Sequence, residues 1–278
     1  MTAKIQSKVY RFAVYAGAFF SMAVLVLIVG YILIKGIPHL SPELFAWEYN
    51  SNNVSMMPSI INTLLMTLIS LIVCVPLGIG AAIYLTEYAR RGSRLVKIVR
   101  MTAETLSGIP SVVYGFFGLV VLVPLVREIF GGTGSSLLTA CILLGMMILP
   151  TIITVSESAL NAVPSSYYEG ALALGASHER SVFHVVLPAA KSGVMAGVIL
   201  GIGRAIGEAT AVMMVAGNRT SMPKGLLKGV RTLTSNIVME MGYATDMHRE
   251  ALIATAVVLF VFILIINILT SILKRRSN

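Results

Sequence analysis

Arg204 and Glu208 are the two residues of this sequence whose types and spacing could do chemistry inside an apolar segment. They lie four positions apart in the run 193–217, so a continuous helix would place both side chains on one face. A guanidinium keeps its charge and presents a planar set of donors that fits a tetrahedral oxyanion. Glu208 would hold this group and partly neutralise it when no anion is bound. The pair therefore predicts an anion path or, in the simpler interpretation, a structural salt bridge between two spans.

The position of Arg204 along its helix favours the functional interpretation. If the helix begins near Lys191, Arg204 lies about 20 Å along its axis, close to the middle of a bilayer. A charge at that depth costs at least about 2.5 kcal/mol, and ionisable residues within spans as a rule mark transport pathways. The same run contains small residues that predict close packing against another helix, namely Gly193, Gly197, Gly201, Gly203 and Gly207.

The composition places the elements that carry this pair in lipid. Hydrophobic residues make up 56% of the chain and charged residues 12%, and the mean hydropathy is +0.87. About a quarter of the residues of soluble domains are charged. Cys74 and Cys141 both fall in apolar runs, so we expect small buried hydrophobes and neither a disulfide nor a metal site.

Six apolar runs are long enough to cross roughly 30 Å of hydrocarbon as helices. Pro110 lies near the start of the third run, where it should kink or break the helix. We expect an all-α membrane protein with one six-helix domain over 12–273, an N-terminal segment 1–11 and a basic tail 274–278. The expected spans are 12–33, 59–85, 101–125, 137–156, 193–217 and 251–273.

The distribution of basic residues predicts the orientation of these spans. Six spans put both termini on one side, and that side receives thirteen of the 21 Lys and Arg residues against seven on the other. Such an excess marks the cytoplasmic face, so both termini are expected to be cytoplasmic. The net charge of +9 is then explained by orientation and anionic lipid, and no nucleic-acid partner is needed.

The segment 164–188, between the fourth and fifth spans, is polar enough to lie in water and carries helix signals. Ser166 and Glu169 have the spacing of a capping box, and Gly175 can end a short helix in the left-handed conformation. Ser177 can start a second short helix that stops before Pro188. Two short helices at an angle form an elbow, a shape that suits a socket in another protein.

The residues of this elbow resemble the cytoplasmic signature of the membrane subunits of bacterial ATP-binding-cassette (ABC) importers. Gly170 stands where alanine is usual in that signature, and Val185 where isoleucine is usual. The resemblance implies the type I permease fold, in which the elbow is a coupling helix that docks into a groove of an ATPase subunit. It is carried by Glu169, Gly170, Ala171, Gly175, Leu187 and Pro188.

Other segments resemble the permease subunits of the bacterial inorganic phosphate importer, and the PstC-type subunit more than its PstA-type partner. They are 86–89, 108–115, 203–208, 211–218 and 231–234. The resemblance implies a location in the bacterial inner membrane, two ATPase subunits, a second related permease subunit and an extracytoplasmic phosphate-binding protein. It also implies that phosphate passes Arg204 and Glu208.

The sequence contains no phosphate-binding glycine loop of the G-x-x-x-x-G-K-[ST] kind and no evident nucleophile and base pair. We therefore expect no catalytic activity, cofactor or metal in this subunit, and ATP hydrolysis in its partners. An importer of another oxyanion, such as sulfate or molybdate, is the first alternative, and an ion-coupled secondary transporter the second. Glu104 and Glu157, near membrane boundaries, are expected to be solvated helix ends.

Overall fold

The computed structural model describes residues 2–50, 53–90 and 92–276, and the expected all-α architecture is confirmed for that part of the chain. Six of its helical segments are long and apolar enough to cross a membrane, which also confirms the expected number of spans. They are Ser7–His39, Met57–Tyr88, Ser111–Phe130, Leu137–Asn161, His178–Gly207 and Asp246–Ile272.

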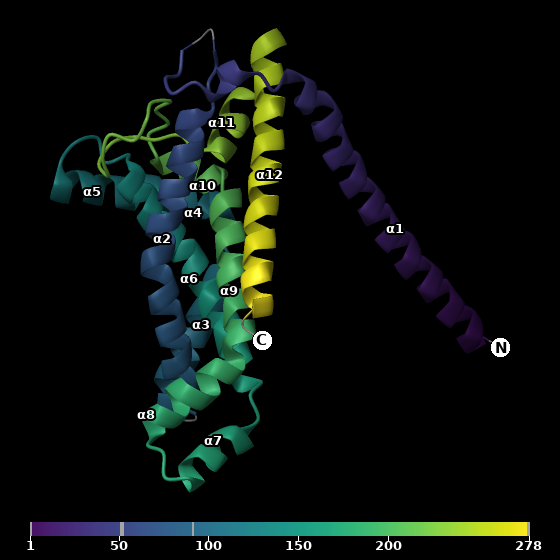
Figure 1. The fold of residues 1–278 in the computed structure, drawn as a ribbon, viewed down its shortest axis with the longest axis vertical. Helices are drawn as coiled ribbons and strands as arrows, with labels where there is room; N and C mark the ends of the chain where they lie inside the picture. Colours follow the sequence, from purple (N-terminus) through teal and green to yellow (C-terminus); the bar gives the residue numbers. More distant parts are fainter. Residues whose placement is uncertain (1, 51–52, 91, 277–278) are drawn as a thin grey trace.

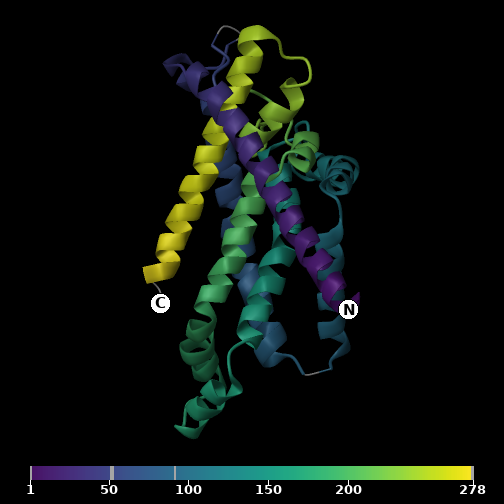
Figure 2. The ribbon, with the colours of Figure 1, turned by 90° about the vertical axis from the view of Figure 1, so that its right-hand side faces the viewer.

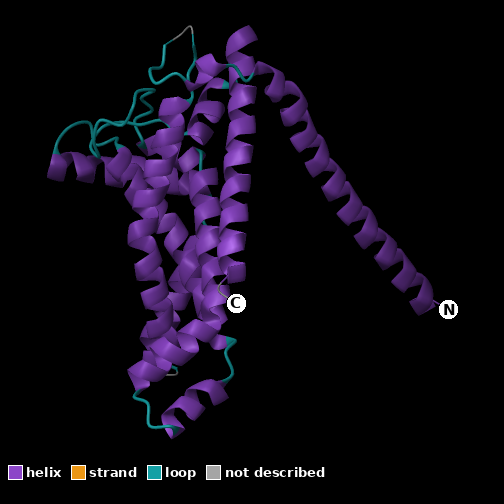
Figure 3. Ribbon diagram, in the orientation of Figure 1, coloured by secondary structure: helices purple, strands orange, loops and turns teal. Residues whose placement is uncertain are grey.

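Short 3-10 and π turns interrupt or extend several of the α-helices. The longer loops lie at the two ends of the bundle (Figure 3). The elements in chain order are α1 (Thr2–Gly36), η1 (Ile37–His39), η2 (Pro42–Phe45), α2 (Met57–Ile83), η3 (Tyr84–Tyr88), α3 (Arg94–Gly108), α4 (Ser111–Phe117), η4 (Gly118–Leu122), α5 (Val123–Phe130), α6 (Leu137–Asn161), α7 (Ser165–Ala173), α8 (His178–Ser181), η5 (Val182–Val186), α9 (Leu187–Gly207), α10 (Thr210–Val215), α11 (Leu233–Glu240) and α12 (Asp246–Arg276).

Helix α6 forms the centre of the core and packs against both α2 and α9. Glycines allow this close approach, because a Cβ at Gly78 of α2 would lie 2.7 Å from Ile152 of α6. On α9, a Cβ at Gly201 would lie 3.1 Å from Ile152, and one at Gly193 would overlap Ala159. Gly197 makes the same kind of contact, so the predicted packing role is confirmed for these three glycines of α9.

Helix α1 leans away from the bundle and approaches it only near its C-terminal end (Figures 1 and 2). There Gly36 packs so closely on α12 that a Cβ would lie 2.9 Å from the carbonyl oxygen of Ile253. The helix already begins at Thr2, so the expected separate segment 1–11 is instead the first part of the same helix, Met1 lying outside the described residues.

Two other boundaries differ from the expected ones. Helix α12 continues to Arg276, so the start of the expected tail 274–278 extends the last helix, while residues 277–278 lie outside the described residues. The expected third span 101–125 is two elements, α3 and the span Ser111–Phe130. The predicted break is confirmed: Ile109, before Pro110, is extended with φ −72° and ψ 130°.

Helices α7 and α8 lie at one end of the bundle, and both marked ends of the chain point toward that end (Figure 1). An even number of spans requires this arrangement of the termini. The elbow and the termini therefore share one side, and the assignment of that side to the cytoplasm stays a prediction from the charge distribution.

Candidate functional site

The fifth span is interrupted next to the residues that the sequence singled out. Helix α9 ends at Gly207, Glu208 is extended with φ −72° and ψ 122°, and α10 begins at Thr210. The expected continuous helix over 193–217 is therefore wrong. The Glu208 carboxylate accepts a hydrogen bond from the backbone N–H of Ala211 at 3.0 Å, so it satisfies the start of α10.

Helix α11 supports this break with side-chain hydroxyls. Thr234 donates to the carbonyl oxygen of Glu208 at 2.9 Å, and Ser235 donates to that of Ala209 at 3.5 Å. Thr232 caps α11 by accepting from the Ser235 N–H at 3.2 Å. Interrupted backbone at membrane depth is tolerated only where neighbouring groups satisfy it or a cavity adjoins it. These hydroxyls explain how the break persists.

Arg204 lies one turn before the break and is half-buried. Within the part of the chain that the structure describes, its guanidinium makes no hydrogen bond or ion pair. The expected Arg204–Glu208 pair is therefore not formed, because the helix that would align the two side chains ends between them. Gly203 and Gly207, which were expected to pack against another helix, have open space beside them. The guanidinium is thus available to a ligand.

A second break between helices adjoins the same place, directly before the third span. At the break between α3 and α4, the Tyr114 hydroxyl donates to the carbonyl oxygen of Leu106 at 2.8 Å. Tyr114 is buried and lies within electrostatic reach of Arg204. Helix α4 packs on α10, where a Cβ at Gly115 would lie 3.0 Å from the Cα of Ala211. Interrupted helices that meet inside a membrane are typical of substrate sites in transporters.

The elbow has the expected two helices, with two corrections. Gly175 adopts φ +84°, as predicted, and Ser177 caps α8 by accepting from the Arg180 N–H at 3.3 Å. The capping box at Ser166 is wrong, because α7 begins at Ser165 and has no side-chain cap. The second helix also does not stop before Pro188, because the π turn η5 leads α8 directly into α9. Pro188 lies in the first turn of α9, where its lack of a backbone N–H does not end the span.

Much of the surface of the elbow is exposed and is not covered by other described parts of this chain. Leu174, at the end of α7, is 91% exposed, and Tyr167 and Leu172 are also exposed. Of the residues that carry the signature, Glu169, Gly170, Gly175 and Pro188 are exposed, and Ala171 and Leu187 are half-buried. A compact apolar knob in water is typical of a surface that another protein covers.

Three rings join the elbow to the C-terminal end of the second span. Nδ1 of His178 on α8 lies 2.7 Å from the Tyr168 hydroxyl on α7. The ring of Tyr88 in η3 packs edge-on against the same imidazole, with centroids 4.6 Å apart. The sequence analysis missed this junction, and the spacing of the three residues gave no signal for it.

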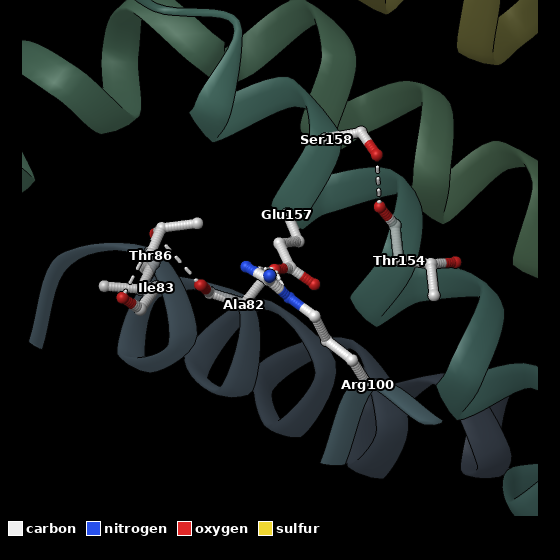
Figure 4. Close-up of polar contacts among 7 residues, drawn as sticks. All are labelled: Ala82, Ile83, Thr86, Arg100, Thr154, Glu157 and Ser158. Carbon is white, nitrogen blue, oxygen red and sulfur yellow. Dashed lines mark hydrogen bonds and ion pairs between the residues drawn. The ribbon is translucent and has the colours of Figure 1, made fainter. Parts of the chain in front are cut away.

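The sequence analysis also missed an ion pair between Arg100 of α3 and Glu157 of α6 (Figure 4). Nε of Arg100 donates to Oε1 of Glu157 at 2.5 Å, and Nη2 contacts the same oxygen. Glu157 is buried, so its expected role as a solvated helix end is wrong, whereas Glu104 is exposed as expected. A carboxylate within an apolar helix and without a local counter-charge was the available signal.

Comparison with known proteins gives one family and several relatives. Residues 74–278 match the family described as "Binding-protein-dependent transport system inner membrane component". The chain is 38% identical to the probable ABC transporter permease protein YqgH of Bacillus subtilis, over 94% of this chain and 90% of that protein. It is 33% identical to the phosphate transport system permease protein PstC of Pasteurella multocida, over 84% of this chain and 79% of that protein.

Solved structures with a similar fold include chains of ABC transporters. A chain of the inward-facing MetNI methionine ABC transporter superposes with a TM-score of 0.61 at 19% identity, over 90% of this chain and 98% of that one. A chain of a bacterial alginate ABC transporter, in complex with an alginate-bound periplasmic protein, superposes with a TM-score of 0.65 at 16% identity, over 97% and 96%. At these identities the similarity concerns the fold.

Proposed function

The chain belongs to the family of binding-protein-dependent transport system inner membrane components, and from this premise we propose that it is a translocation subunit of an ATP-driven importer for inorganic phosphate. Membership makes it a multi-pass inner membrane protein that is not itself catalytic and that works with ATPase and binding-protein partners. Two ATPase subunits, a second permease subunit and an extracytoplasmic phosphate-binding protein complete the proposed assembly.

The observation that carries the proposal is the unpaired Arg204 guanidinium where two breaks between helices adjoin. Its planar donors match the oxygens of a tetrahedral oxyanion. A half-buried cation without a carboxylate partner is electrostatically unsatisfied, and a transported anion relieves this. Glu208 contributes by fixing the start of α10, and so the shape of the break, instead of neutralising the arginine.

The elbow supplies the link to ATP hydrolysis in this proposal. Closure of the ATPase subunits moves the exposed knob around Leu174, and α9 carries the movement toward Arg204 because η5 and α9 continue from α8 without a loop. The residues assigned to this coupling are Glu169, Gly170, Ala171, Gly175, Leu187 and Pro188. The elbow and both termini then face the cytoplasm, as the basic residues predict.

Phosphate is favoured over other oxyanions by relatives that are named phosphate transport system permease proteins. Sulfate or molybdate remains the alternative substrate, because an arginine fork fits any tetrahedral oxyanion. An ion-coupled secondary transporter does not agree with the family. The test is uptake of radiolabelled phosphate by the complete reconstituted complex in the presence of unlabelled phosphate, sulfate or molybdate. Only phosphate should compete; stronger competition by sulfate or molybdate would reassign the substrate.

A further inference from the structure

The Arg100–Glu157 ion pair joins two residues that are 57 positions apart in the chain, one on α3 and one on α6. The Glu157 side chain is 9% exposed, whereas that of Arg100 is 46% exposed. Figure 4 shows the two side chains pointing toward each other from α3 and α6. The arginine therefore reaches from a partly exposed position on α3 to a buried carboxylate on α6, which lines a cavity of about 290 Å³ together with Arg100.

Hydroxyl side chains near Glu157 bond to backbone carbonyls and not to its carboxylate. Thr154 and Ser158 on α6 donate their hydroxyls to the carbonyls of Pro150 and Thr154 at 3.0 and 2.8 Å. Thr86 on η3 likewise donates to the carbonyls of Ala82 and Ile83 at the end of α2 (Figure 4). These neighbouring hydroxyls thus bond to the backbone, and among the described residues Arg100 is the only side chain that pairs with Glu157.

Separation of α3 from α6 would take from the Glu157 carboxylate the only cationic partner that it has among the described residues. Removing one partner of a buried ion pair is strongly unfavourable for this reason, even where the intact pair adds little net stability. A conformational change that keeps the pair intact avoids this penalty. The inner part of α6 and α3 should therefore move as one body.

The pair lies between the elbow and the substrate site. On one side, Glu157 is four residues before Asn161, where α6 ends ahead of the elbow. On the other side, α3 leads to the break at Ile109–Pro110, across which the Tyr114 hydroxyl reaches Leu106. Beyond this break, α4 packs on α10, the helix that follows the break after Arg204. A force on α6 near the elbow therefore has a direct route through α3 to the break at Ile109–Pro110.

We propose that Arg100 and Glu157 are positioning residues of the transport cycle, which lock α3 to α6 so that movement of the elbow changes the path at the Ile109–Pro110 break. This inference rests on the proposed function, because it requires an elbow driven by an ATPase. It assigns no substrate contact to either residue. The pair transmits movement and stays closed throughout the cycle.

The first test is the ratio of anion transported to ATP hydrolysed by the complete complex in proteoliposomes. Arg100→Gln and Glu157→Gln should each lower this ratio about tenfold, since the link is lost while the ATPase still docks. Matched controls are Lys97→Gln and Glu104→Gln, exposed residues of the same helix α3, which should change it less than about twofold. The exchange Arg100→Glu with Glu157→Arg should restore much of the loss. Single variants that match their controls would overturn the proposal.

The second test covers the case in which single variants assemble poorly. In a background with Cys74 and Cys141 replaced by alanine, Arg100→Cys and Glu157→Cys are joined by a short bifunctional thiol reagent. Because the two positions are proposed never to separate, cross-linking should restore coupled transport relative to the unlinked double variant. Transport that is abolished by the cross-link would show that α3 and α6 must part, and would overturn the proposal.

A wrong substrate assignment is distinguishable from failure of this link. If the substrate assignment is wrong, the wild-type complex transports another oxyanion, and the ratio of anion transported to ATP hydrolysed is measured with that anion. Failure of the proposed function appears in the wild type, whereas failure of the link appears only in the comparison between variants and controls.

Discussion

Thr234 on α11 donates its hydroxyl to the backbone carbonyl of Glu208, at the point where the fifth span is interrupted. The two residues are 26 positions apart, and the bond of 2.9 Å supplies a partner that the helix itself no longer provides. A continuous helix would satisfy this carbonyl internally and would align Glu208 with Arg204. The hydroxyl thus helps to keep Arg204 unpaired.

Thr234→Val should destabilise the break, because it leaves the Glu208 carbonyl without its hydroxyl partner. We expect a loss of about 1–3 kcal/mol in unfolding free energy together with reduced phosphate uptake. Thr234→Ser should restore both. The matched control is Thr255→Val on α12, whose hydroxyl bonds only to the Ala251 carbonyl one turn earlier. Equal effects of the two valine variants would contradict a special role of Thr234.

Substitution of the glycines of α9 by alanine should affect stability differently on the face that packs against α6 and on the face that has open space. Gly193→Ala would overlap Ala159 and should cost about 1–3 kcal/mol in the stability of the isolated subunit. Gly203→Ala meets open space and should be neutral or stabilising by up to about 1 kcal/mol. Thermal unfolding in detergent measures both. A destabilised Gly203→Ala subunit would show that this face is already packed within the chain.

Leu174→Asp should abolish co-purification of the ATPase subunit, since it places a charge on the exposed knob of the elbow. The isolated subunit should keep its stability within about 0.5 kcal/mol, because Leu174 is almost fully exposed. Gly170→Ala is the control: its added methyl group meets no atom within 4 Å. Retention of the ATPase by the Leu174→Asp variant would contradict docking at this knob.

Much of the fold was accessible from the sequence because the signals are local. Six apolar runs of sufficient length predict six spans, and each is found with shifted boundaries. Pro110 and the left-handed Gly175 are features that one or two residues determine by their own backbone chemistry. Both were therefore predictable without any knowledge of neighbouring helices.

The details of the candidate site depend on contacts between distant segments. The break after Gly207 is stabilised by Thr234 and Ser235 of α11, and the sequence alone does not show that these distant residues lie next to it. The Arg100–Glu157 pair likewise depends on how α3 packs on α6. The residue types at these positions indicated a role in the site, whereas the sequence did not show which residues they contact.

Uptake of radiolabelled phosphate by complexes that carry Arg204→Gln tests the central claim most directly. The matched control is Arg219→Gln, which removes an exposed arginine from the loop after α10, and co-purification of the ATPase verifies assembly of both variants. The account predicts that Arg204→Gln lowers the initial uptake rate about tenfold or more, because the anion loses its charged donors, while Arg219→Gln stays near the wild type. Undiminished uptake by an assembled Arg204→Gln complex would contradict the placement of Arg204 on the phosphate path.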